Sequence, residues 1–160
     1  MPVEIVEVIP DHAPLLLQMI HELAEFEKMK DSVLNTEKQL RSDIERKAVL
    51  GFIALDGTEP AGMNLFYYAY STWVGQYIHM EDLYVRPIYR RQGIARKLWK
   101  TLAVLAKNNG NQRIEWAVLD WNKGAIALYD TVNYTNLTKN QGWYTFRMDR
   151  EAIEKLANEN

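Results

Sequence analysis

The residues best suited to acid–base catalysis and phosphate binding lie between positions 81 and 95, where the chain reads EDLYVRPIYRRQGIA. A Glu-Asp pair opens the stretch, and the arginines at 86, 90 and 91 follow it. Gly93 then precedes a segment with helical periodicity, so the last arginines lie beside the expected start of a helix. A helix N-terminus presents free N–H groups and positive dipole density, and cationic neighbours complete a phosphate or pyrophosphate site. The alternative is a solvated basic loop that caps the helix.

The spacing of the glycines excludes two common phosphate-binding loops. The chain contains neither a Gly-x-x-x-x-Gly-Lys-Ser/Thr loop nor a Gly-x-Gly-x-x-Gly fingerprint,. The ligand that carries the phosphate is therefore predicted to be neither bound ATP nor a dinucleotide.

Composition narrows the chemistry further. The 160 residues include 19 Lys and Arg and 21 Asp and Glu, which gives a net charge of −2. This near-neutral charge argues against a protein whose main task is to bind nucleic acid phosphates. There is no cysteine, which excludes a disulfide scaffold, a thiolate nucleophile and a thiolate metal site,. His12, His21 and His79 show no metal-ligand spacing, so we expect no metal,. A structural role on its strand is favoured for His79, and the alternative is that it reaches the active site.

Length and hydropathy predict one domain over residues 1–160,. No apolar run approaches the roughly 20 residues that span a bilayer, and the first ten residues do not resemble an export signal. We therefore expect a cytoplasmic protein with no membrane partner.

Hydrophobic periodicity gives the order of the elements that must position these residues. Strands are predicted over residues 3–9, 49–55, 61–70, 76–85, 113–119, 133–138 and 142–149. Helices are predicted over residues 12–29, 36–46 and 93–109, from residue 122, and in the tail over 150–160. Three strands run consecutively before the main helix, which indicates a mixed α/β (α+β) fold rather than a regular doubly wound one.

The sequence RRQGIA at 90–95 fits the Arg/Gln-x-x-Gly-x-Gly/Ala signature of the GNAT superfamily of acetyl-CoA-dependent N-acetyltransferases. Further matches follow in order along the chain: HELAEFEKM at 21–29, YSTW at 70–73, MEDLYV at 80–85, AVLDWN at 117–122, LY at 128–129 and GW at 142–143. Together they resemble the spermidine/spermine and thialysine N-acetyltransferase branch over nearly the whole chain. The resemblance implies the GNAT-type acyl-CoA N-acyltransferase fold, a central mixed, mostly antiparallel sheet flanked by helices. It also implies a homodimer.

The resemblance implies acetyl-CoA (coenzyme A) as the cofactor and assigns residues to it. The backbone of Leu83, Tyr84 and Val85 is expected to pair with the pantetheine arm. The pyrophosphate is expected to lie against Arg90, Arg91, Gln92, Gly93, Ile94, Ala95 and Arg96. Further cofactor contacts are expected from Asn122, Lys123, Gly124, Ala125 and Tyr129.

The implied reaction is direct attack of an amine on the acetyl thioester, since the chain has no cysteine to carry the acetyl group. A lysine-like amine has a pKa near ~10.4 and must lose a proton first. Glu81 or Asp82 is the candidate general base, directly or through water, and the resemblance favours Glu81. Neighbouring strand residues point to opposite faces, so we expect only one of the two to face the substrate. Tyr129 is the candidate general acid toward the departing thiolate, and its alternative is a core aromatic residue.

The resemblance also implies which residues line the amine site: Phe26, Glu27, Trp73, Glu81, Asp82, Gln141, Gly142 and Trp143. Carboxylates and aromatic faces suit a small-molecule cationic amine. Ser71 and Gln141 stand where polyamine acetyltransferases have acidic residues, which lowers the negative charge offered to a polycation. We therefore favour a thialysine- or lysine-like amino acid or a diamine over spermine. The short turn at Asp56-Gly57 hints at a bacterial member.

Two other functions remain open. The first is a protein or peptide N-acetyltransferase on the same fold, which needs an open groove for an extended chain. The second is a non-catalytic acyl-CoA-binding module, against which the presence of both Glu81 and Tyr129 argues.

Overall fold

The computed structural model describes residues 2–159 and divides the chain into two compact units, Met1–Trp121 and Asn122–Asn160. The first unit holds the sheet and three helices, and the second holds three further helices. Each unit is described by itself below. The single-domain organisation expected from length stays a prediction.

The first unit is built on a five-stranded sheet in the order β1-β2-β3-β4-β5. The pairs from β1 to β4 are antiparallel and the β4–β5 pair is parallel, which confirms the predicted mixed, mostly antiparallel sheet. Its strands are β1 (Glu4–Glu7), β2 (Leu50–Asp56), β3 (Glu59–Ser71), β4 (Gly75–Val85) and β5 (Ile114–Glu115).

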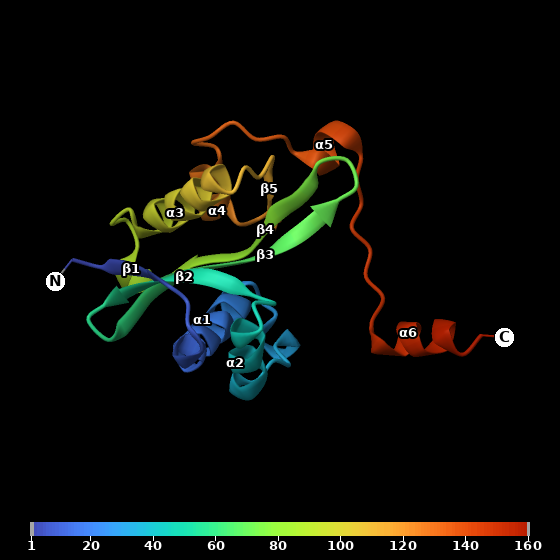
Figure 1. Cartoon of the computed structure of the whole chain (residues 1–160), viewed down its shortest axis with the longest axis horizontal. Helices are drawn as coiled ribbons and strands as arrows, with labels where there is room; N and C mark the ends of the chain where they lie inside the picture. The colour runs from blue at the N-terminus through green and yellow to red at the C-terminus, as the bar shows by residue number, and fades with distance from the viewer. Residues whose placement is uncertain (1, 160) are drawn as a thin grey trace. The chain divides into compact units, whose positions relative to one another are not determined.

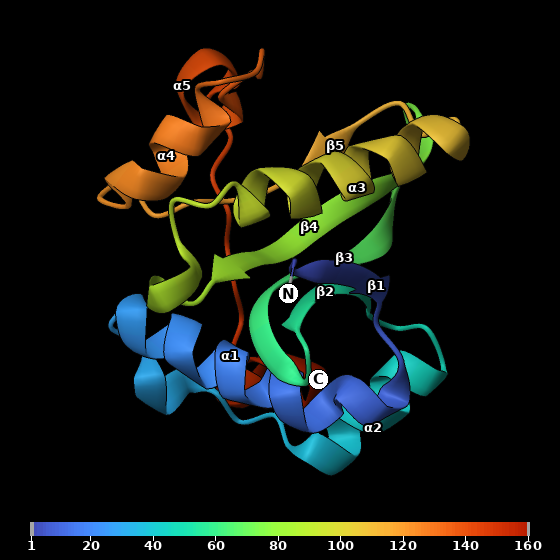
Figure 2. The same ribbon diagram turned by 90° about the vertical axis from the view of Figure 1, so that its left-hand side faces the viewer.

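Helices cover both faces of this sheet. Figures 1 and 2 show α1 and α2 across one face and α3 across the other. The helices of the first unit are α1 (Ala13–Phe26), α2 (Glu37–Glu45) and α3 (Ile94–Asn108), with 3-10 turns at Pro10–His12, Lys30–Ser32 and Pro87–Tyr89. The second unit contains α4 (Lys123–Tyr129), α5 (Leu137–Gln141) and α6 (Arg150–Ala157).

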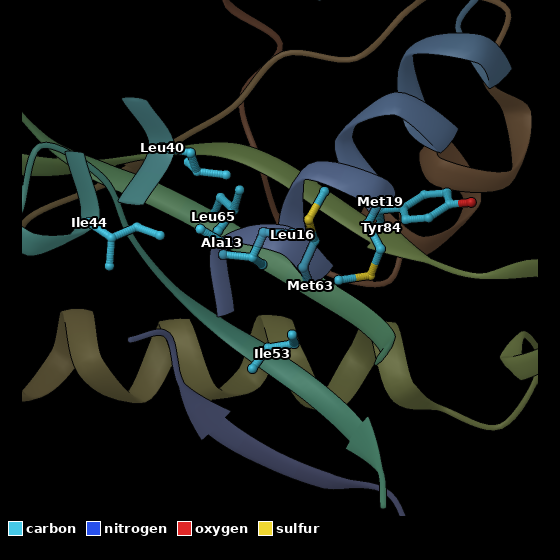
Figure 3. Packing of buried hydrophobic residues seen from close by; sticks show 9 residues of the cluster. All are labelled: Ala13, Leu16, Met19, Leu40, Ile44, Ile53, Met63, Leu65 and Tyr84. Atoms are coloured by element: carbon cyan, nitrogen blue, oxygen red, sulfur yellow. The ribbon is translucent and has the colours of Figure 1, made fainter. Parts of the chain in front are cut away.

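One half of the main core fills the space between the sheet and the α1–α2 pair. Leu16 and Met19 of α1 are fully buried, and they meet Met63 and Leu65 of β3 across this layer (Figure 3). Burial of such side chains stabilises the fold by about 1.5–3 kcal/mol each. Leu65 of this core pairs with Asp82 of β4. Residues directly opposite each other on two strands point to the same face, so the Asp82 side chain lies on the face of the sheet that α1 and α2 cover.

The C-terminal part of the chain departs from the predicted strands. The strand expected over 113–119 pairs only at Ile114–Glu115, and those expected over 133–138 and 142–149 are absent. Asn136 accepts a hydrogen bond from the Lys139 backbone N–H (2.9 Å), which starts α5, and Gly142 ends it with a φ of 74°. Local capping therefore outcompetes the strand pattern there. The tail helix is confirmed as α6.

Residues 142–149 alternate apolar and polar side chains but have no partner strand among the described residues. Tyr144, Phe146 and Met148 are 79%, 90% and 57% exposed. A strand forms only where another backbone accepts its hydrogen bonds, so the alternation alone does not produce one.

Candidate active site

The C-terminal half of β4 has one open edge. On one side β4 pairs with β3 as far as Val85, opposite Gly62. On the other side its ladder with β5 covers only Ile78 and His79. Backbone groups of residues 80–85 therefore face no strand on that edge within the described part of the chain. Such an edge can pair with the amide groups of an extended ligand.

A β-bulge in β4 brings two carboxyls to the same face. Leu65 pairs with Asp82 and Phe66 with Met80, which leaves Glu81 as an extra residue without a register partner on β3,. Both Glu81 and Asp82 line one cavity of about 290 Å³ on the side of α1 and α2. The bulge interrupts the alternation of the strand, so both carboxyls lie on this face. Which of the two faces the substrate stays a prediction.

Burial and neighbouring charge shift the acidity of this cluster. Burial, together with the smaller effects of the negative charges of Glu81 and Glu27, raises the pKa of Asp82 to about 7. Burial and the charge of Glu81 also raise the pKa of Glu27, at the end of α1. The structure thus brings three predicted site residues together as one acidic cluster, Glu27, Glu81 and Asp82. A carboxyl with a pKa near neutrality accepts and releases protons at physiological pH.

The shift of Asp82 predicts a pH-dependent stability. Between its ordinary value of 3.8 and about 7, the folded chain keeps a proton that the unfolded chain has lost. The free energy of unfolding therefore falls as pH rises through this range. Asp82→Asn cannot ionise, so we expect it to match the wild type near pH 4 and to exceed it above pH 7 by up to about 4 kcal/mol. Urea unfolding at a series of pH values measures this difference.

Asp43 supplies a control of opposite sign. Hydrogen bonds from Arg46 and Gln39 lower the pKa of its carboxyl. Asp43→Asn should therefore lose stability relative to the wild type at neutral pH, and the loss should vanish in acid. A gain for Asp82→Asn that is the same at every pH would contradict the assignment.

Arg86 holds α1 against the sheet. Its guanidinium donates to both carboxylate oxygens of Glu22 at 2.7 and 3.1 Å and to the Pro60 carbonyl at 3.2 Å. The Tyr84 hydroxyl donates to the same Glu22 carboxylate at 3.2 Å. The charge of Arg86 is thus already paired with Glu22. The network ties α1 to β4, the two elements that carry the acidic cluster.

The start of α3 has the features expected of an anion site. Gly93, at the N-cap, has a φ of 77°, and open space lies where its side chain would be. Arg91 also adopts the left-handed conformation with a φ of 64°. No acidic residue occupies the first turn of the 15-residue helix, so its free N–H groups are not screened by a carboxylate there,.

The Arg90 guanidinium lies close to two aromatic rings. Its Nε donates to the Val85 carbonyl at 3.0 Å, and its guanidinium carbon lies 5.6 Å from the Phe26 ring centre and 5.9 Å from that of Tyr84. Phe26 also contacts the Trp121 ring, with 5.6 Å between centroids. The end of α1, the end of β4 and the segment after β5 therefore meet at the open edge of β4.

Trp73 and the carboxyl cluster are not in contact. Trp73 lies in the turn between β3 and β4 and is 80% exposed, with its backbone N–H bonded to the Ser71 hydroxyl at 3.1 Å. Ser71 also accepts a hydrogen bond from Arg113 at 3.2 Å. The Ser71 hydroxyl thus orders the turn at this position, while the place of Trp73 in an amine site stays a prediction.

The remaining predicted residues belong to the second unit. Asn122 caps α4 by accepting a hydrogen bond from the Ala125 N–H at 3.2 Å, so Lys123, Gly124 and Ala125 form the first turn. Tyr129 is the last residue of α4 and is buried at 8% exposure. Gln141 accepts a hydrogen bond from the Trp143 indole at 3.0 Å.

Comparison with known proteins decides the family. The Acetyltransferase (GNAT) family matches residues 17–134. The chain belongs to the GNAT acetyltransferase family. A thialysine N-epsilon-acetyltransferase from Caenorhabditis elegans is 72% identical to it over 98% of both chains, and one from Sus scrofa is 42% identical over 89% of both. This GNAT member is therefore an N-acetyltransferase.

A solved structure supports the GNAT fold. An integron cassette protein from the mobile metagenome of V. cholerae superimposes with a TM-score of 0.77 at 22% identity, and 99% of each chain is covered. The bacterial source that the short turn at Asp56-Gly57 suggests stays a prediction.

Sequence reasoning missed two features of this GNAT site. The Glu22–Arg86 pair joins residues far apart in the chain, and no local spacing signals it. The bulge at Glu81 depends on the register between β3 and β4, which strand alternation does not reveal.

Proposed function

We propose that this enzyme transfers the acetyl group of acetyl-CoA to the primary amine of a small cationic substrate. The favoured substrates are a thialysine- or lysine-like amino acid or a diamine, within a class that also includes polyamines. The observation that carries the proposal is the acidic cluster, in which Glu27 at the end of α1 joins Glu81 and Asp82 on the stretch of β4 whose other edge is open. A cationic amine at the acidic cluster and an extended amide-bearing ligand at the open edge would thus lie on the same stretch of β4.

The open edge and the α3 start fit coenzyme A. The backbone of Leu83, Tyr84 and Val85 would hold the pantetheine amides, and the start of α3 with Arg91 and Gly93 would hold the pyrophosphate,. Acetyl-CoA supplies an acetyl group activated as a thioester. Gln92, Ile94, Ala95 and Arg96 belong to the same turn, and Asn122 to Ala125 remain proposed contacts in the second unit.

The chain's own residues supply the proton transfers. Glu81 accepts the proton that the ammonium group must lose, directly or through water, with Asp82 as its coupled neighbour. The Tyr129 hydroxyl donates a proton where the thiolate leaves. The chain has no cysteine, so no thiol of this chain can hold the acetyl group as an intermediate between acetyl-CoA and the amine.

The substrate class follows from charge and from the relatives. Proteins 72% and 42% identical to this chain carry the name thialysine N-epsilon-acetyltransferase. Ser71 and Gln141 each form a hydrogen bond and add no negative charge, so attraction for a polycation rests on Glu27, Glu81 and Asp82. We therefore expect an amine with one or two charges to be preferred over spermine.

A thiol-release assay with acetyl-CoA and a panel of amines tests the proposal. The panel holds thialysine, lysine, ornithine, a diamine, spermidine, spermine and a lysine peptide. We expect the highest kcat/KM for thialysine or another small amine. Faster turnover of the peptide would replace the proposal with a peptide acetyltransferase. Acetyl-CoA binding in calorimetry without turnover of any member would replace it with a binding module.

We also propose a homodimer in the cytoplasm. The support is the exposed apolar series Trp143, Tyr144, Phe146 and Met148 in a segment patterned as a strand. A second copy of this chain can offer the backbone partner that the described residues do not provide. Light scattering of the purified protein measures its mass.

No helix within residues 2–159 has the length and apolarity to cross a membrane.

A further inference from the structure

His79 is the neighbour of the Glu81 carboxylate. Its Nε2 lies 3.4 Å from Glu81 Oε2. Its ring stacks on Tyr67 of β3, with 4.8 Å between centroids and 27° between planes. The imidazole is thus held by a ring on one side while its nitrogen is directed at the carboxylate.

Glu81 needs such a restraint. Its side chain is 57% exposed, and the bulge leaves its backbone without a register partner on β3. His79 is its one ion-pair partner among residues 2–159. A long exposed carboxylate samples several rotamers, whereas a general base must lie within hydrogen-bond reach of the proton it accepts. The contact with His79 removes part of that freedom.

We propose that His79 is a positioning residue for Glu81 in acetyl transfer. The contact of its Nε2 with Glu81 Oε2 holds the carboxylate toward the acidic cluster. This inference rests on the proposed function, since it assigns a role relative to the proposed base. The amine proton passes to Glu81 and leaves from there to solvent, so His79 takes up no proton in the step.

Two substitutions separate the donor from the ring. His79→Phe keeps an aromatic partner for Tyr67 and removes the N–H, and His79→Gln keeps a donor and removes the ring. We expect His79→Phe to lower kcat by about 10- to 100-fold while the KM for acetyl-CoA stays the same, because a displaced catalytic group costs rate more than binding. His79→Gln should recover most of kcat. His21→Phe, on the exposed surface of α1, is the matched control and should change neither.

A wild-type kcat for His79→Phe, or no recovery of kcat in His79→Gln, would overturn the positioning role. Nitrogen NMR of the His79 ring supplies a readout independent of turnover. We expect the Nε2-protonated tautomer in the wild type and a changed tautomer balance in Glu81→Gln. If the wild type turns over no amine, the proposed function fails; a ring signal unaffected by Glu81→Gln separately removes the contact itself.

Discussion

Glu81→Gln is expected to lower the kcat of acetyl transfer by about 10²- to 10⁴-fold, the usual contribution of a positioned general base. The amide has nearly the shape of the carboxylate but cannot accept the proton that the ammonium group must lose. The KM for acetyl-CoA should change little, because the open edge of β4 presents backbone groups that the substitution leaves in place. Steady-state kinetics with saturating acetyl-CoA measures both quantities.

The identity of the amine sharpens this test. An amine with a lower pKa is deprotonated more often in solution, so its acetylation should depend less on Glu81. Raising the pH should likewise recover part of the lost rate in Glu81→Gln. Glu25→Gln, on the exposed end of α1, is the matched control and should retain the wild-type kcat. A Glu81→Gln enzyme with wild-type kcat at every pH would transfer the role of base to Asp82 or to water.

Asp82 is not equivalent to Glu81 as the proposed general base. Asp82 is the more buried of the two, and its pKa of about 7 leaves it partly protonated at neutral pH. A proton held by Asp82 removes one negative charge beside Glu81.

The main elements of the first unit could be predicted from local patterns. Thr36 begins α2 by accepting a hydrogen bond from the Gln39 N–H at 3.2 Å, as its spacing indicates. The turn at Asp56-Gly57 joins β2 and β3, with Gly57 at a φ of 62°. These features depend on residues within one turn of chain, so the sequence displays them directly.

Features that depend on partners distant in the sequence could not be predicted. The bulge at Glu81 comes from the pairing of β3 with β4, and the pairing of Arg86 with Glu22 comes from the packing of α1 on the sheet. The pattern at 142–149 is that of a strand, but strand formation requires a partner that the sequence of one segment does not reveal,. Of the acidic cluster, the sequence predicted the members, and the structure added their shared face.

Tyr129→Phe is expected to lower kcat by about 10²-fold, since it removes only the hydroxyl proposed to protonate the departing thiolate. Tyr129 ends α4 and is buried, so the phenyl ring of the variant keeps the packing of the wild type. Acetyl-CoA affinity, measured by calorimetry, should remain close to the wild-type value. Tyr134→Phe is the matched control in the same unit, because its hydroxyl donates to Asp130 at 2.7 Å on the exposed surface.

The alternative role of Tyr129 as a core aromatic residue predicts a different pair of measurements. A buried hydroxyl normally has hydrogen-bond partners, and its loss costs about 0.5–1.5 kcal/mol of stability. If Tyr129 serves packing alone, Tyr129→Phe lowers the unfolding free energy and leaves kcat unchanged. If it serves as the acid, kcat falls far more than such a change in stability can explain, because at neutral pH and 25 °C both enzymes remain folded. The ratio of the two effects therefore distinguishes an acid from a core residue.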